Sequence, residues 1–323
     1  MRALVYTGPE RLEMREVPDA QPGADDALIR IERVGICGSD MHAYLGHDNR
    51  RPAPLILGHE AAGTIVGGAR DGVRVTVNPL VTCGVCPACK AGRDNLCPTR
   101  QIISMPPREG AFAERVAMPL RNLVDLPEGF PAAKAALAEP VACGWHAVRL
   151  GLKALDGRPV RALVLGGGAI GLGAALSLSA QDVSDITLVE PNALRRDYLI
   201  RRCAQNVVEV ADGLFDLVID GVGYEATRAT ASALVRPGGV IVHIGLGSGK
   251  GGLDVRRMTL QEITFIGTYA YTAQDFRDTA RAIFEGHLGP LDWVDERPLA
   301  EGGRAFADIR GGVVAAPKVL LIP

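Results

Sequence analysis

The chain has 323 residues, of which 47% are hydrophobic and 22% charged, and its formal net charge is −2. This length suits two domains rather than one core, and the composition is that of an ordinary globular protein. The charges form no block of one sign, which argues against a nucleic-acid or membrane-surface partner. The N-terminal stretch turns polar too early for a signal peptide, so we expect a cytoplasmic protein whose seven cysteines are thiols or metal ligands.

The first informative stretch, 27–34, alternates apolar Ile29 and Ile31 with charged residues and predicts a strand. Three short motifs follow along the chain: GICGSDMH at 35–42, GHE at 58–60 and AEP at 138–140. The side chains they offer for chemistry are Cys37, Ser39, Asp40, His42, His59, Glu60 and Glu139. Taken singly, each has an ordinary interpretation, such as a small buried thiol for Cys37 or a hydrogen-bonded core histidine for His59.

Taken together, Cys37, His59, Glu60 and Glu139 form the mixed ligand set that is typical of a catalytic zinc with an open position. Zinc makes a bound hydroxyl much more acidic, as the oxidation of an alcohol requires. The remaining residues suggest supporting roles. Ser39 and His42 can pass a proton toward solvent, and Asp40 can orient the far nitrogen of His59.

Between these motifs lies a cluster of four cysteines with the spacing C-x2-C-x2-C-x7-C: Cys83, Cys86, Cys89 and Cys97. A cytosolic chain of this length does not need disulfides, whereas this spacing can turn four sulfurs toward one tetrahedral Zn²⁺. Four thiolates leave no open position for a substrate. We therefore expect a structural zinc that fastens a loop and takes no part in the chemistry.

The stretch from 160 to 181 reads as a buried strand, a glycine-rich turn and a helix of small residues. The turn has the sequence Gly166-Gly167-Gly168-Ala169-Ile170-Gly171, which contains G-x-G-x-x-G. In this context the motif predicts a dinucleotide site, with the pyrophosphate at the N-terminus of the helix.

A second strand ends at Glu190, about twenty residues after the first glycines of the turn. An acid in that place binds the ribose hydroxyls and repels a 2′-phosphate, so NAD is favoured. Arg195 and Arg196 follow closely and could receive that phosphate, which leaves NADP open. The other interpretation of Glu190 is a solvated strand end.

Further strands at 215–223, 238–245 and 263–269 alternate with helical stretches and predict a doubly wound parallel sheet. One connection between two of these strands is too short for the usual parallel crossover. Only the residues ADGLF, 211–215, separate the strands NVVEV and DLVID, while a parallel crossover normally takes a dozen residues or more. This crossing looks out of reach for a complete 3-2-1-4-5-6 sheet, so either the third strand is vestigial or the crossover helix has been lost.

The motifs GICGSDMH, GHE, the four cysteines, AEP and GGGAIG occur in the order in which the zinc-dependent medium-chain alcohol dehydrogenases carry them. The chain resembles that family over nearly its whole length, and most of all its sorbitol and polyol dehydrogenase branch. The resemblance implies a GroES-like catalytic domain at 1–141 and 270–323, with a structural-zinc lobe at 80–100. It also implies a Rossmann domain at 142–269 that binds NAD(P).

Residue by residue, the resemblance implies catalytic zinc positions at Cys37, His59 and Glu60, and a ligand or water-mediated neighbour at Glu139. It places the proton relay at Ser39 and His42. The family's subunits pair through a strand like 264–269, so we expect a homodimer or homotetramer. The chain departs from the pattern of this family in two ways. It is shorter than most relatives between 63 and 73 and before Phe215, and Ala270 stands where polyol dehydrogenases carry an arginine.

The sequence thus predicts an enzyme with two zinc ions per subunit that oxidises a secondary hydroxyl, of a polyol or sugar derivative, to a ketone with NAD. Alternatives of the same class act on threonine, a sugar acid or a simple secondary alcohol. A non-catalytic zinc or nucleotide sensor on the same scaffold is the alternative of a different class. Both zinc motifs argue against a zinc-free quinone reductase.

Overall fold

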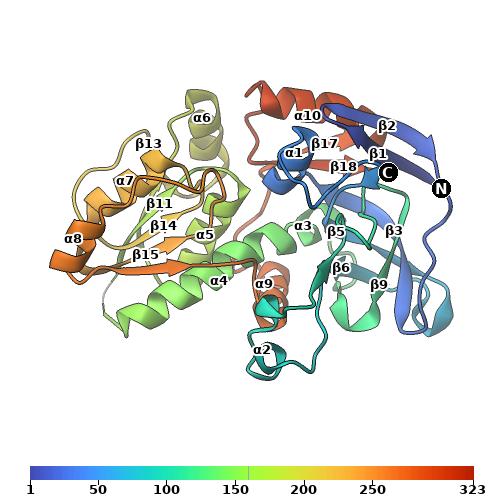
Figure 1. The fold of residues 1–323 in the computed structure, drawn as a ribbon, viewed down its shortest axis with the longest axis horizontal. Helices are drawn as coiled ribbons and strands as arrows, with labels where there is room; N and C mark the ends of the chain where they lie inside the picture. The colour runs from blue at the N-terminus through green and yellow to red at the C-terminus, as the bar shows by residue number, and fades with distance from the viewer. Residues whose placement is uncertain (159) are drawn as a thin grey trace.

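A computed structural model describes residues 1–158 and 160–323, which fold into two halves that lie side by side (Figure 1). One half is built on a mostly antiparallel sheet and contains both chain termini. The other is built on a parallel sheet with helices on both faces. The predicted fold class, a GroES-like domain with a Rossmann domain, is confirmed. Among these residues, no helix has both the length and the apolar character that a membrane crossing requires.

The half with the antiparallel sheet, which corresponds to the expected catalytic domain and is called the catalytic half below, is organised around β3 (Asp26–Gly35), the strand predicted at 27–34. Its path runs β10 (Leu123–Asp125), β6 (Arg74–Val77), β5 (Glu60–Val66), β3, β18 (Lys318–Ile322) and β17 (Val294–Pro298), with β9 (Arg115–Pro119) also paired to β3. The last strand of the chain, β18, therefore lies next to one of the first. This sheet therefore combines strands from the early and the late parts of the sequence.

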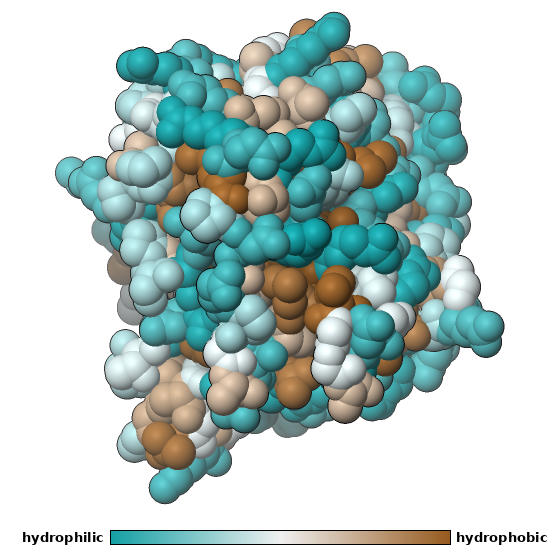
Figure 2. All heavy atoms as spheres, turned by 90° about the vertical axis from the view of Figure 1, so that its right-hand side faces the viewer, coloured by the Kyte–Doolittle hydropathy of each residue, from teal (hydrophilic) through white to brown (hydrophobic). Residues whose placement is uncertain are grey.

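Two smaller sheets complete this half. They consist of β2 (Arg11–Glu16), β1 (Arg2–Gly8) and β4 (Leu55–Ile56), and of β7 (Leu80–Val81) with β8 (Gln101–Ile102). The helices here are α1 (Gly38–Tyr44), α2 (Pro87–Lys90), α3 (Ala132–Ala135) and α10 (Gly302–Arg310). On the face shown in Figure 2, hydrophilic residues cover most of the surface and apolar residues form separate patches.

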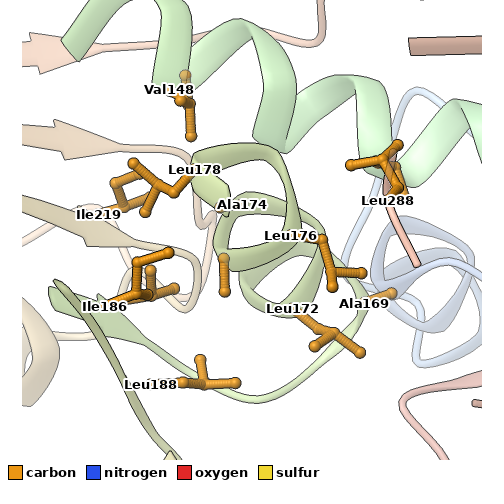
Figure 3. Packing of buried hydrophobic residues seen from close by; sticks show 14 of the residues in the cluster. Val148, Ala169, Leu172, Ala174, Leu176, Leu178, Ile186, Leu188, Ile219 and Leu288 are labelled. Carbon is orange, nitrogen blue, oxygen red and sulfur yellow. The ribbon is translucent and has the colours of Figure 1, made fainter. Parts of the chain in front are cut away.

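The coenzyme half contains a parallel sheet in the order β13 (Asn206–Val208), β12 (Asp185–Val189), β11 (Arg161–Leu165), β14 (Phe215–Asp220), β15 (Val235–His243) and β16 (Thr264–Gly267). Its helices are α4 (Ala138–Leu155), α5 (Ala169–Ala180), α6 (Ala193–Arg202), α7 (Glu225–Leu234), α8 (Val255–Leu260) and α9 (Ala273–Phe284). In Figure 3, Ala174 and Leu178 of α5 lie between Val148 of α4 and the strand residues Ile186 and Ile219.

The short crossover has the second of the two predicted forms: the third strand is present and the helix is missing. β13 pairs with β12, and the sheet order is a complete 3-2-1-4-5-6. Our expectation that the crossing is out of reach is wrong. Seven Cα–Cα steps from Val208 to Phe215 can span about 23 Å when extended. The crossing covers three strand spacings, about 14 Å, and five residues back along the strand direction, about 16 Å, which together need about 21 Å. Ala211 packs on the sheet face where a helix would otherwise lie.

The domain limits at 141/142 and 269/270 stay a prediction. α9, which lies beyond the second limit, packs against α4 of the coenzyme half. There Asp275 accepts hydrogen bonds from His146 Nδ1 (2.7 Å) and Arg149 Nε (2.6 Å). Tyr271 and Phe276 belong to the apolar cluster around α4 and α5. The segment after β16 thus packs against the coenzyme half, although the predicted limit assigns it to the catalytic domain.

Candidate active site and metal centres

Three of the predicted ligands meet at one point. The thiol of Cys37, an imidazole nitrogen of His59 and a carboxylate oxygen of Glu60 all lie within 4.8 Å of one another. His59 and Glu60 are buried, with 4% and 0% of their surfaces exposed. A thiolate, an imidazole and a carboxylate form a donor set that suits Zn²⁺ and leaves a position for a substrate.

The pairing of β3 with β5 brings these residues together. Gly35 lies opposite Glu60 in that antiparallel register, so Cys37 and His59 sit just beyond the paired ends of the two strands. Glycine is required at position 35 because a Cβ there would come 2.0 Å from Glu60 Oε2. The end of this strand pair therefore positions the site.

Two side chains orient His59. Its Nδ1 lies 3.5 Å from Asp40 Oδ1 and 3.3 Å from Ser104 Oγ, which leaves Nε2 for a metal ion. Asp40 is fully buried and also accepts backbone hydrogen bonds from Cys37 (3.0 Å) and Gly58 (3.2 Å). The sequence suggested Asp40 for this position, whereas Ser104 carried no signal.

A buried lysine near the C-terminus completes the centre. Lys318 Nζ donates to Glu60 Oε1 (2.6 Å) and to the carbonyl of Ile36 (2.9 Å). The second carboxylate oxygen, Glu60 Oε2, is buried and has no hydrogen-bond partner among the described residues. A buried carboxylate oxygen without a donor is costly, and a metal ion shared with Cys37 and His59 would satisfy it. The residues present therefore fit a zinc ion.

Glu139 lies close by but outside the three-residue group. At the start of α4 its Oε1 accepts a hydrogen bond from the hydroxyl of Tyr271 (2.7 Å). Burial raises the pKa of Glu139 to about 7, and the neighbouring Glu60 adds to this rise, while His59 and the Tyr271 hydrogen bond oppose it. Tyr271, which the sequence analysis did not single out, thus fixes the position of this carboxyl group.

Ser39 and His42 lie on α1, the short helix for which Cys37 is the N-cap. Ser39 is contacted by a buried arginine, Arg51, which donates to its carbonyl (3.4 Å) and lies 3.5 Å from its hydroxyl oxygen. Arg51 also donates to the carbonyl of Ser104 (3.0 Å), so it contacts both Ser39 and the serine that lies against His59. Nothing in the sequence distinguished it from the other arginines.

The four cysteines meet in a separate group. The sulfurs of Cys83, Cys86, Cys89 and Cys97 lie within 4.8 Å of one another, and all are free thiols. The chain wraps around them through Gly84 and Gly92, which adopt φ values of +75° and +69°. A backbone hydrogen bond from Cys83 is the main cause that lowers the pKa of Cys97, to about 6. Four converging sulfurs fit a tetrahedral zinc ion.

The glycine-rich turn lies between β11 and α5. Within the described residues, no side chain caps α5 at its N-cap, Gly168, and a Cβ there would meet nothing within 4 Å. Gly171 must stay small because a Cβ would come 1.8 Å from the carbonyl oxygen of Gly166. Open space in front of an uncapped helix N-terminus, flanked by Ala169 and Ile170, fits a dinucleotide phosphate.

Glu190 lies beside this turn, where its Oε2 accepts from the amide of Gly167 (3.0 Å) and its Oε1 from that of Asn192 (2.8 Å). Arg195 and Arg196, which follow Glu190 in the sequence, have different hydrogen-bond partners. Arg196 is tied to the carbonyls of Glu190 and Pro191 and to Glu209. Arg195 contacts the carbonyl of Val314 at 3.4 Å, and its Nε has no partner among the described residues.

Comparison with known proteins agrees with this geometry. Residues 23–128 match the alcohol dehydrogenase GroES-like domain, and residues 169–285 match the zinc-binding dehydrogenase family. The chain is 33% identical to L-galactonate-5-dehydrogenase of Escherichia coli, over 89% of this chain and 88% of that one. The chain belongs to the zinc-dependent alcohol dehydrogenases, in their sorbitol and polyol dehydrogenase branch.

Other relatives cover comparable parts of the chain. Sorbitol dehydrogenase of Bacillus subtilis is 32% identical over 84% of this chain and 82% of its own. The structure of acetophenone reductase from Geotrichum candidum in complex with NAD has a TM-score of 0.88 and 25% identity, and covers 100% of this chain and 97% of that one. The family membership makes this chain an oxidoreductase that acts on CH–OH groups and uses zinc and a nicotinamide cofactor.

Cys83→Ser should impair folding far more than chemistry, because the binding energy of a structural metal is part of the stability of its lobe. We expect a lower melting temperature and the loss of about one zinc ion per chain. Metal analysis and thermal unfolding of the purified variant measure both effects. Cys203→Ala, which removes a thiol outside both groups, is the control and should keep its zinc. A Cys83→Ser protein with full stability and full zinc would contradict a structural metal here.

Proposed function

We propose that this chain catalyses the reversible oxidation of a secondary hydroxyl, in a polyol or sugar derivative, to a ketone. The substrate loses a hydride to NAD⁺ and a proton to solvent, and the products are the ketone, NADH and H⁺. The observation that carries the proposal is the group of Cys37 with the buried His59 and Glu60, in which Glu60 Oε2 has no hydrogen-bond partner among the described residues. The printed names of the relatives, which include galactonate and sorbitol dehydrogenases, support this substrate class.

Cys37, His59 and Glu60 would hold the catalytic zinc, and Cys83, Cys86, Cys89 and Cys97 the structural one. A zinc ion in the first site supplies Lewis acidity toward the substrate oxygen. Lys318 pairs with the buried carboxylate of Glu60 at 2.6 Å and holds it in place. Asp40 and Ser104 contact Nδ1 of His59, which would leave Nε2 for the metal. Glu139, held by Tyr271, would act as the water-mediated neighbour of the site.

Ser39 and His42 would carry the proton. Ser39 follows Cys37 by two residues on the same helix turn, so its hydroxyl can accept the proton of the reacting hydroxyl. His42 lies three residues further along α1 and is half-buried, so its imidazole could pass the proton on to solvent. Arg51 supports this route because its donors contact both the carbonyl and the hydroxyl of Ser39.

The glycine turn and Glu190 would hold the cofactor, which supplies the hydride acceptor. The first-turn amides of α5, at Ala169, Ile170 and Gly171, would bind the pyrophosphate. Glu190, which already lies against the turn, would take the adenosine ribose hydroxyls and favour NAD. Arg195 is the residue that would receive a 2′-phosphate, because Arg196 is occupied by other partners.

The alternatives of the same class act on threonine, a sugar acid or a simple secondary alcohol. Ala270, which has a φ of +46°, brings no arginine to the place where polyol dehydrogenases carry one, so the chain must recognise its substrate differently. A non-catalytic sensor would not need Ser39 and His42 beside an open metal position. The orphaned Glu60 oxygen and the relay residues together favour the enzyme.

We further propose that subunits pair through β16, which is bonded on one side only, to β15. Phe265 on this strand is 38% exposed, as expected of a face that a partner covers. A homodimer or homotetramer would result. The four clustered free thiols suit a reducing compartment, which supports a cytoplasmic location.

The direct test is NADH formation, followed by absorbance, from a panel of alditols, aldonates, threonine and simple secondary alcohols. We expect turnover of at least one polyhydroxy compound by the zinc-loaded enzyme and none by the Cys37→Ser variant. Loss of activity after chelation and its return with Zn²⁺ would support the assignment. NADH formation by the Cys37→Ser protein at the wild-type rate would contradict it.

Glu190→Ala should change the cofactor preference. The variant loses a carboxylate that repels a 2′-phosphate, so the ratio of kcat/KM for NADP to that for NAD should rise by at least about tenfold, the equivalent of one charge-assisted hydrogen bond. The control is Asp185→Ala, which removes an exposed acid at the opposite end of β12 from Glu190. An unchanged ratio, or a wild type that already prefers NADP, would show that Glu190 does not select the cofactor.

A further inference from the structure

A cavity of about 460 Å³ lies between the structural-zinc lobe, α4 and the segment that follows β16. Its wall includes Arg93 of the lobe, and His146, Arg149 and Lys153 of α4. The described residues that line it include no candidate zinc ligand, no glycine of the cofactor turn and not Glu190. The cavity is therefore separate from the metal and cofactor sites, and its volume falls within the range of about 300–1,000 Å³ that is usual for small-molecule sites.

The wall of this cavity is positively charged, because its described residues include basic side chains and no acidic one. Arg149 pairs with Asp275 (2.6 Å), which does not line the cavity, whereas Arg93 and Lys153 pair with no carboxylate in the part of the chain that the structure describes. One acid thus offsets one cation. Two positive charges remain, one from the lobe and one from α4.

Nitrogen atoms on this wall remain available for a ligand. Arg149 uses Nε and Nη2 to bind Asp275, which leaves its Nη1. His146 gives Nδ1 to the same carboxylate (2.7 Å), which leaves Nε2. His146 is buried, with 5% of its surface exposed, so its ring is fixed in place. Two acids in neighbouring segments have partners of their own: Asp94 accepts from the amide of Ala273 (3.1 Å) and Asp278 from Gln274 (2.9 Å).

We propose that this cavity binds a phosphate group, either free or carried by a small organic molecule, between Arg93 of the lobe and Arg149 and Lys153 of α4. Phosphate offers several oxygens at once. Arginine binds it through directed N–H groups and lysine as a point charge. Cations from two separate elements favour an anion with two negative charges over a single carboxylate.

A phosphate in this cavity would hold the lobe against the coenzyme half. Asn95 already donates to the carbonyl of Tyr269 (2.8 Å), and both residues line the cavity. Thr272, also on the wall, donates to Asp275 (2.6 Å). Binding would add to these contacts and stabilise the folded protein, so the melting temperature should rise with ligand concentration. Because no residue assigned to the reaction lines the cavity, binding can be measured whether or not the proposed reaction occurs.

The opposing interpretation is that Arg93 and Lys153 are ordinary solvated cations, since both are exposed. Lys153 lies two residues before the end of α4, where the helix dipole favours a cation without any ligand. A second alternative is that the cavity lies against another subunit, because Gly267 at the end of β16 lines it. The first alternative predicts no phosphate binding here. The second predicts that removing the cations changes the oligomeric state.

The test is isothermal titration calorimetry at constant ionic strength, on zinc-loaded protein saturated with NADH so that the cofactor site is filled. Inorganic phosphate and methyl phosphate are the probes, and they distinguish a free phosphate from an ester. We expect a Kd of about 1 mM or lower for at least one of them. Arg93→Gln and Lys153→Gln should each weaken binding about fivefold, and together at least about tenfold, as exposed ion pairs contribute. Arg11→Gln, on strand β2, is the control and should bind like the wild type.

Binding of neither probe at about 20 mM, or equal binding by the wild type and the double variant, would overturn the inference. Phosphate binding that survives in the double variant but is lost in Cys37→Ser would place the anion at the candidate catalytic zinc and overturn it too. A double variant that dissociates into smaller species in analytical ultracentrifugation would assign the cavity to a subunit contact, with the same consequence. If Arg93→Gln loses zinc from the lobe, Lys153→Gln alone decides, because it leaves the lobe unchanged.

Discussion

The ion pair between Lys318 and Glu60 joins the end of the chain to the candidate metal centre, and the catalytic half depends on it. Lys318 begins β18, Glu60 begins β5, and β3 lies between the two strands. Both side chains are buried, at 4% and 0% exposure. Removing one partner of such a pair typically costs about 3–5 kcal/mol, because the other charge is left uncompensated. The sheet, the C-terminal strand and the metal ligands therefore form one unit.

The structural-zinc lobe extends this unit toward the coenzyme half. Asn95 donates to the carbonyl of Tyr269 (2.8 Å), and Asp94 accepts from the amide of Ala273 (3.1 Å). These bonds hold the segment after β16, which carries Tyr271 to Glu139. A metal that fastens the lobe would thus also fix groups around the candidate catalytic site.

Much of the site was predictable because its residues sit in compact motifs. The spacing of the four cysteines, the position of Asp40 after Cys37 and the glycine turn each meet a local chemical requirement. The structure brings the four cysteines together and places Asp40 beside His59. Lys318, Tyr271, Ser104 and Arg51 could not be found this way, because their roles arise from contacts between distant parts of the chain. A lysine at the start of the apolar stretch KVLLI was the one signal available for Lys318. The crossover was misjudged because strand spacing alone does not reveal how far an extended linker reaches.

The central claim is that Cys37, His59 and Glu60 hold a second zinc ion, apart from the one bound by the four cysteines. Metal analysis of pure wild-type protein and of Cys37→Ser, with unfolding measured on both, tests it most directly. The account predicts about two zinc ions per chain in the wild type and about one in a variant that stays folded, in keeping with two separate ligand sets. One zinc ion in the wild type, or two in folded Cys37→Ser, would contradict it.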